Sequence, residues 1–324
     1  MGLLDLALGN LLSPIILSFA LGLAAALARS ELTVPEAVAK GLSIYLLFSI
    51  GFKGGVAVDV AGLDATLVGA LVAGAVLSFV LPFAAFGLLR VMTGLSPLDA
   101  AAVAAHYGSI SIVTFVAGTS VLEAAGIASD GWMVAVAAVM EAPAILSALW
   151  LVARSGEGRP VDGELWREIV LNGSIVLLVG GFAIGWVTGQ PGLDRIGAFI
   201  VDPFQGVLCL FLLDMGLVAG RGLRGARAVL RPGLLAFGLT MPLIGAAAGA
   251  LAGVALGLGT GSVMLFMVLG ASASYIAVPA AMRVALPEAN PSIYLTLSLG
   301  VTFPFNLTLG LPLYLAGARM LTGG

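Results

Sequence analysis

The chain has 324 residues, of which 60% are hydrophobic and only 10% are charged, with a mean hydropathy of +1.14 and a net charge of −3. A soluble domain of this length needs many more charged surface residues, so the composition indicates an all-α integral membrane protein instead. The single cysteine excludes an intrachain disulfide, and the lack of a basic block argues against binding of nucleic acid.

The apolar stretches, each roughly 18 to 28 residues long, predict about ten membrane-spanning helices and are too continuous for barrel strands. Met1 to Asn10 lacks the basic region of a signal peptide, so we expect the first helix to be retained. The first five helices are expected over Leu12–Arg29, Val34–Phe52, Leu63–Arg90, Pro97–Val121 and Ser129–Arg154. The second five are expected over Leu165–Gly189, Ala198–Ala219, Val229–Gly257, Gly261–Leu286 and Pro291–Ala318.

A polar connection at residues 156–164 divides the chain into two halves of five helices, residues 1–155 and 165–324. The halves share a weak internal likeness, since Ser49-Ile-Gly51-Phe-Lys-Gly-Gly55 resembles Asp214-Met-Gly216-Leu-Val-Ala-Gly220. Because five is odd, the second half must enter the membrane from the opposite side. The sequence therefore predicts two inverted-topology repeats, an arrangement typical of secondary transporters.

The basic residues are distributed unequally between the two sides of this topology. Lys53, Arg195 and Arg319 fall on one side, and the other 11 of the 14 fall on the opposite side. These are Arg29, Lys40, Arg90, Arg154, Arg159, Arg167, Arg221, Arg224, Arg227, Arg231 and Arg283. The positive-inside tendency then places the linker in the cytoplasm and both termini outside. The Arg221–Arg231 cluster fits this topological role best, with recognition of anionic lipid or a regulatory protein as the alternative.

Two short polar islands interrupt the expected fourth and ninth helices. The first runs from His106 to Thr114, and the second runs from Gly270 to Tyr275, about 163 residues later. A glycine with hydroxyls at every second residue favours a break in the helix. Such a break survives at bilayer depth only where it faces a cavity. Broken helices at matching positions of two halves indicate a midplane substrate site.

Each island can supply hydroxyl donors and the backbone N–H groups of a half-helix, which together hold a small anion. The alternative is that the serines bond to the preceding turn or pack against neighbours. We favour the site because Ser109 pairs with Ser272 and Ser111 pairs with Ser274. Tyr275 could line the cavity or merely pack. The predicted substrate-binding residues are Gly108, Ser109, Ser111, Gly270, Ser272, Ser274 and Tyr275.

Glu141 is the residue best suited to hold a coupling cation. It lies in the middle of the fifth expected helix, two residues before Pro143, and a carboxylate at this depth is costly unless it is paired, protonated or bound to a cation. We assign it to sodium coordination, with hydroxyl oxygens and freed carbonyls completing the shell. The alternatives are a protonated Glu141 hydrogen-bonded inside the bundle and a proton-coupled mechanism. The predicted sodium ligands are Glu141, Thr114, Ser111 and Ser274.

Two further polar residues are assigned structural roles. His106 is the only histidine and has no carboxylate or thiol neighbours for a metal site, so we favour structural hydrogen bonding. Asn306 follows Pro304 in the tenth expected helix and is interpreted as a packing amide. The chain contains no phosphate-binding loop, nucleophile elbow or metalloprotease helix, which argues against an ATP-driven pump or an enzyme.

These residues resemble the sodium-dependent bicarbonate transporter family of bacteria and cyanobacteria over essentially the whole chain. The likeness is strongest in Tyr107-Gly108-x-x-Ser111-x-x-Thr114, Leu122-Glu123 with Trp132, Met140-Glu141-x-Pro143, and Ala289-Asn290-Pro291-Ser292. The resemblance implies a gate of helices one, two, six and seven and a core of the other six. It also implies a homotrimer in the bacterial inner membrane, elevator-like movement of core against gate, and sodium-coupled bicarbonate uptake inhibited by a PII-like protein on the cytoplasmic face.

The sequence departs from the cyanobacterial members at three places. Their serine run followed by aspartate is Ser272-Ala273-Ser274-Tyr275 here, which loses a carboxylate and a hydroxyl. Their Asp-x-Pro in helix five is Glu141-x-Pro143, which keeps the charge one methylene further from the backbone. In the first island their second serine is Val113, while Ser109 is gained. The linker is also much shorter. Compared with the cyanobacterial members, this chain keeps the backbone dipoles that would bind the anion but has fewer oxygen ligands for the cation.

The leading interpretation is a sodium-coupled symporter for bicarbonate or a similarly small monoanion, with Na⁺ as the coupling ion and no covalent cofactor. A proton- or sodium-coupled carrier of a small organic carboxylate would use the same dipoles. A transport-silent membrane receptor or scaffold is the alternative from another class, because the family aspartate is lost.

Overall fold

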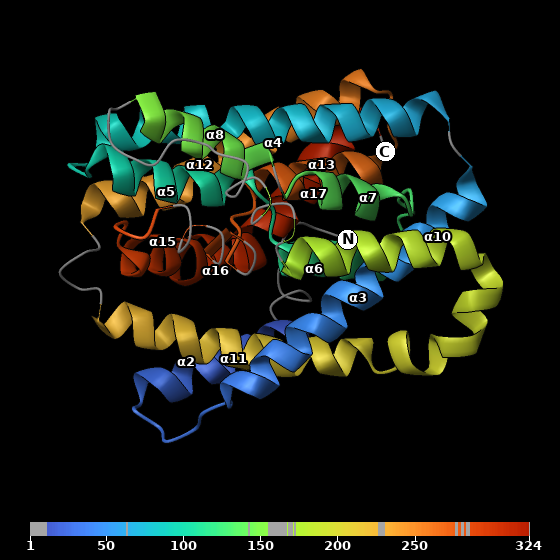
Figure 1. The fold of residues 1–324 in the computed structure, drawn as a ribbon, viewed down its shortest axis with the longest axis horizontal. Helices are drawn as coiled ribbons and strands as arrows, with labels where there is room; N and C mark the ends of the chain where they lie inside the picture. The colour runs from blue at the N-terminus through green and yellow to red at the C-terminus, as the bar shows by residue number, and fades with distance from the viewer. Residues whose placement is uncertain are drawn as a thin grey trace.

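The computed structural model describes residues 12–62, 64–141, 143–154, 167, 171, 173–225, 231–275, 278–279, 282 and 286–323. Several expectations lie outside these residues: the Met1–Asn10 segment, the linker at 156–164, the helix starts at Leu63, Leu165 and Val229, and Arg159, Arg227 and Arg283. The part of the chain that is described is helical and contains no strand, and the helices pack side by side (Figure 1).

Eight helical spans in the described part of the chain are long and apolar enough to cross a membrane, and several of them comprise more than one helical segment. Two shorter apolar helices, α2 (Pro14–Leu27) and α13 (Thr260–Ala271), add to them. The expectation of an all-α, multi-pass membrane protein is therefore confirmed. The count of ten spanning helices stays a prediction.

The first half of the chain contains seven described helical segments in addition to its loops. They are α2, α3 (Glu36–Ala61), α4 (Ala65–Met92), α5 (Pro97–Gly108), α6 (Ile112–Ala124), α7 (Met133–Val139) and α8 (Pro143–Arg154). The second half contains α10 (Gly173–Ile200), α11 (Phe204–Gly225), α12 (Pro232–Ala255), α13, α15 (Pro291–Leu297), α16 (Phe303–Phe305) and α17 (Leu311–Thr322). Two π-helical segments, Ser298–Thr302 and Asn306–Gly310, flank α16.

Side-chain caps fix the starts of several helices. The Asp64 carboxylate accepts the Leu67 amide at 2.7 Å, and the Ser96 hydroxyl accepts the Asp99 amide at 3.0 Å, at the starts of α4 and α5. Asn290 caps α15 in the same way. Pro97 and Pro291 follow two of these caps, where proline loses no helical hydrogen bond, so the expected starts there are confirmed.

Two helix pairs, α2 with α11 and α3 with α10, pack closely through glycines. A side chain on Gly51 of α3 would meet the carbonyl of Leu178 in α10, and one on Gly216 of α11 would meet the carbonyl of Phe19 in α2. Both glycines belong to the internal likeness between the halves. The two similar segments, residues 49–55 and 214–220, therefore each pack against the first described helix of the opposite half. Small residues at such spacing allow close approach of membrane helices.

The remaining helices form a second group, of which α4, α8 and α12 run along the upper part of Figure 1. Of the first group, α2 and α11 lie in the lower part, and α3 crosses the view diagonally. Two long-range hydrogen bonds repeat between the halves of the second group. The Asn290 amide donates to the Asp99 carboxylate of α5 at 2.9 Å, and the Asp130 amide donates to the Ser262 hydroxyl of α13 at 2.9 Å. Asp99 and Ser262 are both the third residue of their helices.

Two expected boundaries are wrong. The second helix does not end at Phe52 but continues to Ala61, because its glycine-rich stretch packs against α10 instead of forming a turn. The seventh begins at Phe204, the start of α11, and not at Ala198. The expected end of the sixth helix at Gly189 agrees with the structure, because Gly189 has a non-helical conformation with φ of +55°, and a second helical segment follows this kink to Ile200.

The fifth expected helix, Ser129–Arg154, is interrupted at Met140 and Glu141 rather than continuous. Pro143 lacks an N–H, which removes the helical bond to the Val139 carbonyl. Ser78 of the neighbouring α4 takes the place of the next helical bond, because its hydroxyl donates to the Met140 carbonyl at 2.6 Å and accepts the Ala144 amide at 3.2 Å. The sequence predicts a freed carbonyl at this proline but not the contact with Ser78.

Candidate functional site

The first polar island separates two helices within one spanning segment, Pro97–Ala124. Helix α5 ends at Gly108, and α6 begins at Ile112. Ser111 caps α6, since its hydroxyl accepts the Thr114 amide at 3.2 Å and the Thr114 hydroxyl at 2.9 Å. The expected break is present, and a half-helix begins at this point.

The second island ends α13 at Ala271 and leaves Ser272 to Ser274 outside any helix. Ser274 then has the role that Ser111 has in the first half, because its hydroxyl accepts the Val278 amide at 3.4 Å. Residues 278, 279 and 282 are helical, while 276–277, 280–281 and 283–285 lie outside the described residues. Both islands therefore contain a helix end followed by a serine that accepts an amide from the segment after it.

The two breaks contact each other directly. The Ser111 amide donates to the Ser272 hydroxyl at 2.9 Å, and the Ser274 amide donates to the His106 carbonyl at 2.7 Å. All of these residues are buried, with Ser111 the most exposed at 3%. Backbone groups that leave the helices are thus satisfied across the break, as a low-dielectric interior demands.

Glu141 lies beside the first break. The Ser109 hydroxyl donates to its Oε2 at 2.7 Å, and the carboxylate is 4% exposed. Among the described contacts, hydrogen bonds join Glu141 to Ser109 and not to Ser111, Thr114 or Ser274. Among the residues that the structure describes, no three histidine, cysteine, aspartate or glutamate side chains lie together as a group that could hold a metal ion. A cation here would rely on a single carboxylate and on neutral oxygens.

The two glycines predicted as binding residues are positions of close packing. A side chain on Gly108 would collide with the ring of Pro82 and approach the Ser78 carbonyl. A side chain on Gly270 would collide with the carbonyl of Gly245 in α12. Both glycines let a half-helix end approach the neighbouring spanning helix. Their role in the structure is to position the breaks.

The aromatic residues of the islands are packed. The Tyr275 ring lies edge-on to Phe303 with centroids 5.2 Å apart, and its buried hydroxyl sits near Ser111 without a well-formed hydrogen bond. His106 stacks on Tyr294 at 4.4 Å, and its Nδ1 is 2.7 Å from the Ala102 carbonyl oxygen. The structural role favoured for His106 agrees with these contacts.

Asn306 does more than pack between helices. Its Nδ2 donates to the Ala271 carbonyl at the second break at 2.9 Å, and its Oδ1 accepts the Tyr314 hydroxyl at 2.7 Å. Asn306 therefore supports the second break, and Ser78 supports the interruption that carries Glu141. The signal for Asn306 was its place two residues after Pro304. Nothing in the sequence near Ser78 marks its role.

A second polar network links the two halves. The Tyr107 hydroxyl lies 2.6 Å from the Thr302 hydroxyl, which in turn donates to the Gly238 carbonyl at 2.7 Å. Pro242 stands inside α12, four residues after Gly238, and so leaves that carbonyl without its helical donor. Sequence reasoning did not identify Thr302, whose partner lies in a distant helix.

The arrangement combines half-helix starts, buried hydroxyls and one carboxylate in a single place. In comparisons with known proteins, a family model described as the Na⁺-dependent bicarbonate transporter superfamily matches residues 14–319. No curated protein matches the chain. The match covers nearly the whole chain, including both breaks and Glu141. The chain therefore belongs to the Na⁺-dependent bicarbonate transporter superfamily.

Proposed function

We propose that the protein is a secondary active transporter that couples uptake of bicarbonate, or a similarly small monoanion, to sodium. The observation that carries this proposal is the direct contact between two interrupted helices, through the Ser111 amide and the Ser272 hydroxyl. An interrupted helix has backbone N–H and C=O groups that are not paired within the helix. Two interrupted helices in contact therefore form a polar site inside an apolar helix bundle.

The anion would bind at the start of α6. The first amides of a helix have no acceptor within the helix, and the Ser111 side chain already holds the Thr114 amide. The Ile112 and Val113 amides are then the donors available to an anion, together with the partial positive charge of the helix start. Such a site holds an anion without a fixed cation, which favours release as well as binding. The segment after Ser274 would contribute in the same way.

Sodium would bind close to Glu141. The Ser109 hydroxyl donates a hydrogen bond to the Glu141 carboxylate, which leaves the lone pairs of the hydroxyl oxygen free for a cation. These two groups therefore offer the oxygen ligands that a hard cation such as sodium prefers. The hydroxyls of Ser111, Thr114 and Ser274 belong to the same proposal. A bound cation would also offset the cost of placing both a carboxylate and an anion at low dielectric.

The transport cycle we propose is an elevator movement of a core against a gate. The gate would consist of α2, α3, α10 and α11, and the core of α4 to α8 with α12, α13 and α15 to α17. The packing of α2 on α11 and of α3 on α10 through equivalent glycines supports a gate built from two inverted repeats. The paired bonds at Asp99 and Ser262 support the same symmetry in the core.

Three further features belong to this proposal. We expect a homotrimer in the bacterial inner membrane, with both termini outside and the arginine-rich side in the cytoplasm. We also expect that a PII-like regulatory protein would bind on that cytoplasmic side. Crosslinking of the purified protein and labelling of a cysteine introduced near the C-terminus, such as Thr322→Cys, would check the assembly and the topology. The native Cys209 would be replaced by serine first.

The decisive experiment is uptake of labelled bicarbonate by purified protein in liposomes, with and without an inward sodium gradient. We expect uptake that requires sodium and is reduced by unlabelled bicarbonate. A matched potassium gradient serves as the control. Uptake driven equally by either cation would contradict sodium coupling. Stronger competition by acetate or lactate than by bicarbonate would assign the site to organic carboxylates, and absence of any counterflow would contradict transport.

A further inference from the structure

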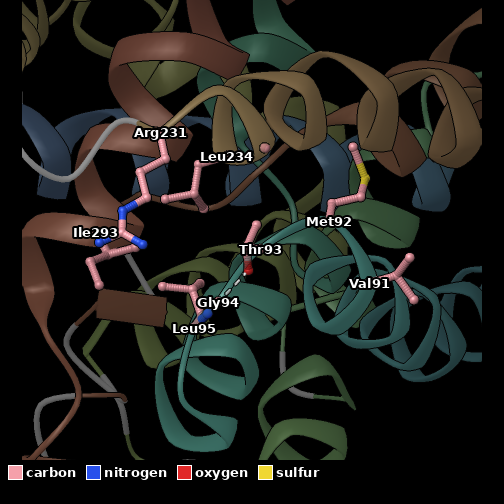
Figure 2. A pocket seen from close by; sticks show the side chains of 9 residues that line it. Val91, Met92, Thr93, Gly94, Leu95, Arg231, Leu234 and Ile293 are labelled. Atoms are coloured by element: carbon pink, nitrogen blue, oxygen red, sulfur yellow. Dashed lines mark hydrogen bonds between the residues drawn. The ribbon is translucent and has the colours of Figure 1, made fainter.

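A cavity of about 390 Å³ lies at one end of the helix bundle, outside the two helix breaks (Figure 2). It is formed where α4 ends, where α12 begins and where α15 begins. These segments lie toward the left of Figure 1. Its volume is within the range typical of small-ligand sites. The residues that matter for its chemistry are Val91, Met92, Leu95, Arg231, Leu234 and Ile293.

Five of the side chains that line this cavity are apolar, and Arg231 is the one charged side chain among the lining residues. Figure 2 shows the guanidinium of Arg231 reaching over the cavity beside Ile293. Thr93 also lines the cavity, but its hydroxyl donates to the Leu89 carbonyl at 2.6 Å. In the part of the chain that the structure describes, Arg231 makes no ion pair. Among the described residues, the cavity therefore combines one cation with a set of apolar side chains.

The cavity lies where lipid headgroups are expected. Met92 is the last residue of the spanning segment Ala65–Met92, and Pro232 is the first of Pro232–Ala255. Val91, which lines the cavity in the last turn of α4, is 86% exposed, so an apolar side chain is available there to a molecule from outside the helix bundle. Headgroups and the first methylenes of their chains meet a spanning helix at this depth.

The start of α12 adds to the attraction for a negative charge. Arg231 is the N-cap residue of α12 and makes no side-chain capping bond. Pro232 has no N–H, and the Leu234 amide donates to the Arg231 carbonyl at 2.9 Å, so the Gly233 amide and the helix dipole are what the first turn adds to the guanidinium. A free, hydrated anion would lose water against the apolar side chains of the cavity, whereas an amphiphile would gain from them.

We propose that this cavity binds the headgroup of an anionic phospholipid, with its phosphate on Arg231 and an acyl chain leaving past Val91. The lining segments of α4, α12 and α15 all belong to the group of helices that contains the two breaks. A bound lipid would then stabilise that group and not bridge to α2, α3, α10 or α11. The proposal is independent of which anion is transported.

The test compares Arg231→Gln with Arg224→Gln, which removes an exposed arginine of α11 that does not line the cavity. Delipidated protein in detergent is titrated with phosphatidylglycerol, phosphatidylcholine or inorganic phosphate. Lipid retention is read by native mass spectrometry, and thermal unfolding is measured in parallel. We expect phosphatidylglycerol to stabilise the wild type and Arg224→Gln. Its apparent affinity should fall about fivefold in Arg231→Gln, the effect expected of one arginine at a membrane surface.

Two further variants keep the proposal testable if Arg231→Gln fails to fold. Arg231→Lys keeps the charge and should keep most of the lipid retention, while Leu95→Trp fills the cavity and should abolish retention with Arg231 intact. Equal retention of phosphatidylglycerol by Arg231→Gln and Arg224→Gln would overturn the proposal. So would equal stabilisation by phosphatidylcholine, and a matching effect of inorganic phosphate would show a simple ion site.

Discussion

Ser109 donates a 2.7 Å hydrogen bond to Glu141, and this bond joins the break in one spanning helix to the interruption in the next. Both residues are buried, and both stand where helical hydrogen bonding stops. A membrane protein tolerates such a concentration of unsatisfied backbone and charge only where the groups satisfy one another or bind a solute. The bond between Ser109 and Glu141 therefore links the proposed anion site to the proposed cation site.

Glu141→Gln should remove the sodium dependence of uptake while leaving the assembly intact. The substitution keeps the size of the side chain and an acceptor for the Ser109 hydroxyl, but removes the charge that would hold the cation. Because the buried carboxylate is costly without a partner, the variant should be at least as stable as the wild type in sodium-free buffer. Uptake in liposomes across a series of sodium concentrations, with thermal unfolding in parallel, provides the measurement.

Glu288→Gln is the matched control, since it removes an exposed carboxylate that follows the second break without lining it. Its sodium response should equal that of the wild type. If Glu141→Gln retains an unchanged sodium response, the cation site has been assigned to the wrong carboxylate.

Ser111→Ala and Ser274→Ala should each weaken anion binding. Each serine accepts an amide from the segment that follows its break, at 3.2 and 3.4 Å, and so orients the amides available to the anion. Loss of such a cap costs about 1 kcal/mol, which corresponds to roughly a fivefold change in affinity. Ser43→Ala is the control, because the Ser43 hydroxyl donates only to Ala39 in its own helix. Equal effects of all three variants on bicarbonate binding would show that the serines of the two islands are structural and do not form the anion site.

Ser78→Ala should disturb the cation site from a distance. Without the hydroxyl, the Met140 carbonyl loses its 2.6 Å bond and the Ala144 amide loses its acceptor. Leaving buried backbone groups unsatisfied should destabilise the protein by about 1–3 kcal/mol. The sodium concentration for half-maximal uptake should rise more than that for bicarbonate, because the affected turn carries Glu141. Thr119→Ala, whose hydroxyl donates within its own helix, should alter neither quantity.

The features that could be predicted from the sequence are those encoded by adjacent residues. A glycine beside alternating serines predicts a break within a span, and the structure places breaks at both islands. Long apolar runs predict spanning helices, and proline after a polar cap predicts the starts at Pro97 and Pro291. Each of these signals lies within a few residues of the feature that it determines.

The features that could not be predicted depend on a partner far along the chain. The interruption at Glu141 requires Ser78, which belongs to a different helix and resembles any other serine in an apolar run. The role of Asn306 depends on the Ala271 carbonyl, which can accept its hydrogen bond because α13 ends at Ala271. The expected end of the second helix at Phe52 is wrong for the same reason, since Gly55 lies in a continuous helix and packs against the backbone of Phe182 and Trp186 in α10.

Gly108→Ala should damage the protein far more than glycine-to-alanine changes usually do. The added methyl group would collide with the ring of Pro82, which cannot move aside because it is part of the helix backbone. Overpacking of this kind costs about 1–3 kcal/mol, and it would push the first break away from α4. Gly87→Ala in α4 is the matched control, because a side chain there meets nothing within 4 Å and should be neutral or slightly stabilising. Thermal unfolding of both variants, followed by bicarbonate uptake at a temperature where each is folded, separates loss of stability from loss of transport. Equal stability and equal uptake in the two variants would show that the first break does not depend on its contact with Pro82.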